Sequence, residues 1–133
     1  MIHYMPHVSR IKLEQKVEKD LIKTLEFVLT KLTKEEEMNG FLLSLMTPTE
    51  RLMLAKRLAM TVLLKEKMPD SHISATLNVT RGTVSRMQLF LEARGQGYDY
   101  ALRKLQNEKI MQEFKGVLIK LAAYTVRAAG GRI

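Results

Sequence analysis

The chain has 133 residues, of which 46% are hydrophobic and 27% charged, a composition typical of one ordinary globular domain. Its net charge of +8 favours an anionic partner such as nucleic acid. The lack of cysteine excludes disulfides, thiolate metal sites and cysteine nucleophiles, and fits a cytoplasmic protein. No secretory signal is visible, and no apolar run reaches the roughly 18 residues of a membrane span. We therefore expect no membrane partner.

Three helices are expected in the first half of the chain. Apolar residues recur at helical spacing over about residues 9–32. The second helix should start at Thr33, which has capping-box spacing to Glu36. The segment 47–50 offers a capping threonine, a proline at the first helical position and a reciprocal glutamate, and so starts a third helix that Pro69 ends. The expected buried face of this third helix comprises Leu52, Ala55, Leu58, Val62 and Leu63.

Three further helices are expected in the second half. A short helix over 71–77 precedes a helix that Thr80 caps and that the glycines at 95 and 97 end. A long C-terminal helix should cover 99–129, where apolar positions alternate by three and four. Its expected apolar stripe comprises Leu102, Leu105, Ile110, Phe114, Val117, Leu121 and Tyr124. No strand is convincing, so the predicted fold is all-α, with about six helices in one domain over 1–133.

Residues 71–93 fit a helix-turn-helix, which needs a short helix, a tight turn and a second helix that enters the major groove. Apolar anchors and a small crossing residue occur at suitable spacing: Ile73, Ser74 or Ala75, Leu77, Val79 and Val84. Asn78 stands where the turn often has glycine, and asparagine tolerates left-handed backbone angles. This pattern predicts binding to double-stranded DNA.

Short polar residues at the start of the second helix would face the DNA. Arg81 could donate two hydrogen bonds to a guanine edge, Gly82 would let the backbone approach closely, and Ser85 would face the bases. Other residues are candidates for contacts with the DNA backbone, which position rather than specify. The predicted DNA-binding set is Ser71, Ser74, Thr80, Arg81, Gly82, Thr83, Ser85 and Arg86.

The segments 47–51 (TPTER) and 79–86 (VTRGTVSR), with Arg57 between them, resemble the Trp repressor superfamily. The resemblance covers about residues 40–102. It implies an all-helical, intertwined homodimer whose two reading heads lie one DNA turn apart. It also implies a transcriptional regulator, and we expect a repressor that occupies a two-fold operator.

The resemblance also implies a possible ligand pocket. Thr47, Arg57 and Arg86 match the residues that hold the ligand in the tryptophan-responsive member of the family. Met87 stands where that member has glycine, and Phe90 where it has serine, so both add bulk in or near the pocket. We therefore expect no cofactor and no tryptophan binding. Phosphate contact, a salt bridge or helix capping are the alternative roles of the two arginines.

The remaining features predict no chemistry. The spacing of His3 and His7 could hold a metal on a helix, but Pro6 argues against a helix there, so no metal site is expected. No catalytic triad or phosphate-binding glycine loop occurs, and we expect no enzyme. The basic C-terminal helix is best interpreted as extra packing, with added DNA affinity or protein docking as alternatives. The rival to DNA binding is a helical protein-interaction module.

Overall fold

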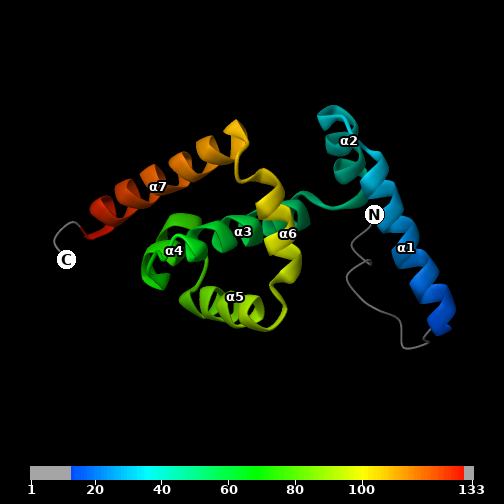
Figure 1. Cartoon of the computed structure of the whole chain (residues 1–133). Coiled ribbons are helices and arrows are strands. Elements are labelled where there is room, and N and C mark those ends of the chain that lie inside the picture. Colours follow the sequence, from blue (N-terminus) through cyan, green and yellow to red (C-terminus); the bar gives the residue numbers. More distant parts are fainter. Residues whose placement is uncertain (1–12, 131–133) are drawn as a thin grey trace. The chain divides into compact units, whose positions relative to one another are not determined.

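The computed structural model describes residues 13–130, and all regular structure in this range is helical (Figure 1). In chain order the helices are α1 (Gln15–Lys31), α2 (Glu35–Leu45), α3 (Pro48–Lys65), α4 (Asp70–Leu77), α5 (Arg81–Arg94), α6 (Gln96–Leu105) and α7 (Lys109–Gly130). This confirms the all-α class. The chain divides between Thr47 and Pro48 into an N-terminal unit with α1 and α2 and a C-terminal unit with α3 to α7. The single domain over 1–133 stays a prediction.

The N-terminal unit has no buried side chain between residues 13 and 47 in the single chain. The capping box predicted at Thr33 is wrong, because α2 begins two residues later, with Lys34 at its N-cap and no side-chain cap. Three glutamates fill the first turn of α2, where their charge complements the positive end of the helix. The acidic run therefore marks the start of α2 better than the threonine does.

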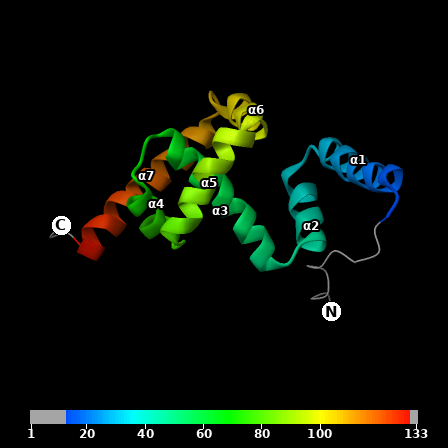
Figure 2. The same cartoon turned by 90° about the horizontal axis from the view of Figure 1, so that it is seen from below.

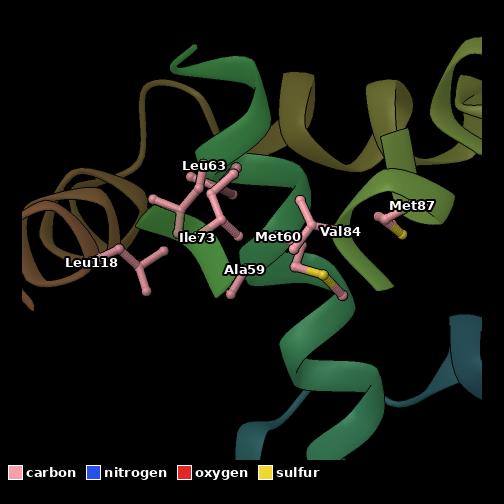
Figure 3. Close-up of a cluster of buried hydrophobic side chains, with 8 residues drawn as sticks. Ala59, Met60, Leu63, Ile73, Val84, Met87 and Leu118 are labelled. Carbon is pink, nitrogen blue, oxygen red and sulfur yellow. The ribbon is translucent and has the colours of Figure 1, made fainter. Parts of the chain in front are cut away.

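The core of the C-terminal unit lies where α3, α4, α5 and α7 meet (Figure 3). Leu63 of α3, Ile73 of α4 and Val84 of α5 are fully buried, and Leu118 of α7 joins the same cluster. Burying a side chain of this kind is worth about 1.5–3 kcal/mol before entropy is counted. This cluster therefore ties the helix-turn-helix to α3 on one side and to α7 on the other.

Only the C-terminal half of α3 has the buried face expected for the whole helix. Val62 and Leu63 are buried and Leu58 is partly buried, whereas Ala55 is exposed and Leu52 is 56% exposed. The other helices of this unit contact α3 around its buried run from Ala59 to Leu63. The first turns of α3 therefore have no cover within the C-terminal unit.

The long helix predicted over 99–129 is wrong, because α6 ends at Leu105 and α7 begins at Lys109 (Figures 1 and 2). The backbone N–H of Glu108 donates to the carbonyl of Leu105 over 2.9 Å, which closes a turn between them. The side-chain amide of Gln112 donates to the carbonyl of Gln106 over 2.9 Å and satisfies an end of α6. The polar connection favours a turn, and the turn lets α7 pack on α4 and α3.

The packed face of α7 differs from the expected stripe. Among the side chains of α7 that the structure describes, Met111, Leu118 and Ala122 are buried, and α4 is the main neighbour of the helix (Figure 2). The expected stripe residues Ile110 and Val117 are instead exposed. Periodicity locates an apolar face but does not say which of two adjacent faces a neighbouring helix covers.

Candidate nucleic-acid interface

The turn between α4 and α5 has the chemistry that its sequence predicts. Asn78 adopts left-handed angles, with φ 54° and ψ 54°, and thereby reverses the chain after α4. The N–H of Val79 donates to the carbonyl of Ser74 over 3.1 Å, and the Ser74 hydroxyl donates to the carbonyl of Val79. The single hydroxyl proton of Ser74 is therefore used inside the protein. A phosphate contact by Ser74 stays a prediction that needs this bond to open.

The apolar anchors of the helix-turn-helix are confirmed. Ile73 and Val84 are fully buried, and Leu77 and Val79 pack against the same core. Buried side chains before and after the turn fix the angle between α4 and α5. The start of α5 is thus held rigidly on the outside of the C-terminal unit.

Thr80 caps α5 as predicted. Its Oγ1 accepts a hydrogen bond from the N–H of Thr83 over 3.0 Å, and the two threonine hydroxyls lie 2.8 Å apart. The first turn of α5 contains no acidic residue, so no side chain of that turn neutralises the positive end of the helix dipole. Such a helix start attracts anions, including the phosphates of a nucleic acid.

Arg81, Gly82, Ser85 and Arg86 are all exposed, as base or phosphate contacts require. Nη2 of Arg81 lies 3.3 Å from Oδ1 of Asp70, an acidic residue in the first turn of α4 that the sequence reasoning missed. Exposed pairs of this kind contribute about 0–1 kcal/mol, so Arg81 can leave Asp70 at little cost. The pair holds the Arg81 side chain beside the first turn of α4.

Gly82 leaves the surface of α5 open. A methyl group at this position would lie 3.6 Å from Nη1 of Arg86 and 3.8 Å from Oγ1 of Thr80, which are ordinary contacts. The protein itself therefore does not require glycine here. A ligand that approaches the helix backbone closely would require it.

The net charge is confined to one of the two units. Residues 48–133 contain fifteen lysines and arginines against seven acidic residues, whereas residues 1–47 contain seven of each. The unit with the helix-turn-helix thus accounts for the whole net charge of +8. A positive field around α5 would steer an anionic polymer to it and strengthen its binding.

A cleft of about 640 Å³ opens beside α5, between α3 and α5. Three cations line it, Lys56, Arg57 and Arg86, and no carboxylate does. The remaining lining is largely apolar and comprises Met53, Met60, Val79, Thr80, Thr83, Met87, Phe90 and Tyr98. This lining suits an anionic ligand with a flat apolar part.

The predicted pocket residues are brought together only in part. Arg57 and Arg86 line the cleft, whereas Thr47, the last residue of the N-terminal unit, does not. Met87 and Phe90 line the cleft where their bulk was expected, and the exclusion of tryptophan stays a prediction. The guanidinium of Arg86 donates to the Thr83 hydroxyl over 3.3 Å, which links the cleft to the start of α5.

Lys56 is a cleft residue that the sequence reasoning missed. Its Nζ lies 3.5 Å from the carbonyl of Asn78, so it also touches the turn of the helix-turn-helix. The signal for it was its place beside Arg57 on α3, one residue away from a predicted ligand contact.

Two other expectations concern metal and membrane. Among the described residues, no group of three potential metal ligands comes together, and His3 and His7 lie outside the described range. None of the described helices combines the length and the apolarity that a membrane span requires.

The sequence model of one family, the Trp repressor protein, matches residues 20–106, about two thirds of the chain. The chain belongs to the Trp repressor family. The match begins within α1, includes the whole helix-turn-helix and ends one residue after α6, so that α7 lies outside it. Searches of curated proteins and of solved structures found no significant match. Membership and the helical fold together support a DNA-binding regulator.

Proposed function

We propose that this protein is a sequence-specific regulator of transcription that acts in the cytoplasm and represses a promoter by occupying a two-fold operator. The observation that carries the proposal is the start of α5. It presents exposed Arg81, Gly82 and Ser85 from a threonine-capped turn without acidic residues. The same unit holds the whole net positive charge. These features suit insertion of α5 into the major groove of double-stranded DNA.

Each side chain of the interface has a role in this proposal. Arg81 reads a guanine edge, Gly82 admits the base pair to the helix backbone, and Ser85 contacts a neighbouring base. The phosphates are held by Ser71, Thr80, Thr83 and Arg86. Ser74 is omitted because its hydroxyl proton already serves the turn.

The proposed active form is a homodimer that joins both units into one helical domain. Its support is the lack of burial in the N-terminal unit, where Leu21, Ile22 and Phe27 are 58%, 57% and 60% exposed. Large apolar side chains at this density are normally covered in the working protein. An intertwined partner would cover them and place two copies of α5 about 34 Å apart, one turn of DNA.

No ligand is needed for DNA binding in this proposal. The cleft beside α5 has the cations for an anionic ligand, but Met87 and Phe90 project where the tryptophan-responsive relatives are expected to have small residues. Affinity for the operator should therefore be the same with and without L-tryptophan.

The test compares Arg81→Ala with Arg94→Ala on the duplex that the wild-type protein selects from a random pool. Both arginines are exposed on α5, but Arg94 lies in its last turn, away from the proposed contacts. Arg81→Ala should cost about 1–3 kcal/mol and relax the preference at one base pair. Arg94→Ala should leave that preference intact. An Arg81→Ala variant with unchanged affinity and preference would refute the proposal and favour the protein-interaction module.

A further inference from the structure

The exposed face of α7 is a surface that the match to the family does not explain, because that match ends before the helix begins. Ile110, Val117 and Tyr124 are 64%, 62% and 68% exposed, and Leu121 is 41% exposed. Phe114 lies between them, packs with one side against the core and is otherwise exposed. Large apolar residues gathered on one helix face indicate a contact surface.

This surface is not the result of a loosely attached helix. Met111, Leu118 and Ala122 of the adjacent face are buried against α4 and α3, and Leu118 points into the shared core (Figure 3). Nζ of Lys115 lies 3.2 Å from Oε2 of Glu66, the residue that follows α3, and adds a polar contact. The packed face fixes the rotation of α7, so the four exposed residues of the set face away from the C-terminal unit, and Phe114 lies at the edge between the two faces.

The exposed residues have the spacing of a coiled-coil seam. Ile110, Phe114, Val117, Leu121 and Tyr124 alternate by four and three residues, which places them at the two core positions of a heptad repeat. One border of this seam is Met111 and Leu118, which the chain already buries. The seam therefore suits a second helix with the same apolar spacing. The charged residues of that helix must complement those on the opposite border of the α7 seam.

The opposite border carries Glu113, Lys120 and Arg127, all exposed and seven residues apart. Among the described residues, none of the three forms an ion pair. A border with one acidic and two basic residues can complement itself when two copies run antiparallel. We propose that α7 pairs antiparallel with α7 of a second copy of this chain, Glu113 of each copy facing Lys120 of the other.

The charges select one register of this pair. In that register Ile110 faces Leu121 of the second copy, and Phe114 faces its Val117. Shifting the copies by one heptad would bring Lys120 against Lys120 of the second copy, which is repulsive. A parallel pair would place Glu113 against the Leu118 side, which is already covered by α4 and α3. Only the antiparallel pair in the first register brings the apolar seams together and also places Glu113 opposite Lys120.

The absence of cysteine from the chain allows a direct test by cross-linking. Ile110→Cys and Leu121→Cys, carrying different tags, are co-expressed and mildly oxidised. Both positions are exposed, so neither substitution disturbs the core. The proposal predicts a disulfide between the two variants, and little between two chains of the same variant, because equal positions lie several turns apart. Disulfide formation requires Cα atoms within about 7 Å, so the test is stringent.

Two results would overturn the proposal. Self-cross-linking of each variant without the mixed product would show a parallel pair. No cross-linked product of either kind would show that something else covers the face of α7. Ala123→Cys, also exposed on α7 but outside the seam, serves as the control for random collision when paired with Leu121→Cys. Because the cross-link reports on α7 alone, its failure leaves the proposed DNA contacts and any dimer formed through α1 and α2 untouched.

A charge exchange tests the pairing independently. Lys120→Glu should weaken association of the α7 faces several-fold, measured as loss of mixed cross-linking in the cysteine variants. Adding Glu113→Lys to the same chains should restore it, because the pair is then reversed and not removed. If Lys120→Glu has no effect, or if the second change weakens association further, Glu113 and Lys120 are not opposed.

Discussion

Replacing Gly82 by alanine tests whether glycine is needed at this position for DNA binding or for stability of the fold. The added methyl group would make only ordinary contacts at 3.6 and 3.8 Å with Arg86 and Thr80. Alanine favours a helix over glycine by about 0.5–1 kcal/mol, so the variant should be slightly more stable than the wild type. For a protein of this size we expect the melting temperature to rise by about 2–5 °C. The methyl group would nevertheless stand on the face that we propose meets the bases.

DNA affinity should therefore fall while stability rises. Loss of one close base contact costs about 1–3 kcal/mol of binding free energy, which raises the dissociation constant roughly 5- to 150-fold. Fluorescence anisotropy with the selected duplex measures the affinity, and thermal unfolding measures the stability. Gly116→Ala on α7 is the matched control: the methyl group meets nothing within 4 Å, so stability should rise and affinity stay constant. A Gly82→Ala variant with wild-type affinity would refute close approach of DNA to the start of α5.

Three further substitutions test the frame that holds the interface. Gly95→Ala should destabilise the protein, because the new Cβ would clash with the backbone carbonyl of Leu91. Chemical denaturation should show a loss of more than about 1 kcal/mol, and unchanged stability would contradict the tight junction between α5 and α6. Leu118→Asp should loosen the packing of α7 on α4 and lower DNA affinity, whereas Ile119→Asp on the exposed side should do neither. Hydrogen exchange of the α4 amides measures the loosening. Equal effects of the two substitutions would show that α7 does not support the helix-turn-helix. Asn78→Val should cost about 1–3 kcal/mol in thermal unfolding, since a β-branched residue resists left-handed angles, and a neutral result would place the turn in another conformation.

The helix-turn-helix was predictable because its signals are local. Thr80 needs only the N–H of Thr83, three residues away, to cap α5, and Asn78 needs only its own backbone angles to turn the chain. The anchors Ile73 and Val84 lie close in sequence, so their spacing alone fixes which faces meet. Such short-range chemistry leaves tertiary structure little to override.

The wrong predictions concern features that depend on contacts between residues far apart in the sequence. The apolar spacing on both sides of the connection after Leu105 fits one continuous helix, and the packing of α7 on α4 and α3 accompanies the turn there. On α7 two apolar faces compete, and the sequence does not reveal that α4 takes the face of Leu118 and leaves that of Val117 exposed. The link between Arg81 and Asp70 was missed for the same reason, since it joins two helices across the turn.

Selection of duplex DNA from a random pool by the purified wild-type protein tests the central claim most directly. The account predicts enrichment of a two-fold-symmetric site, with half-sites about one helical turn apart, equally with and without L-tryptophan. Enrichment of no sequence, with only weak binding that salt abolishes, would contradict sequence-specific reading by α5.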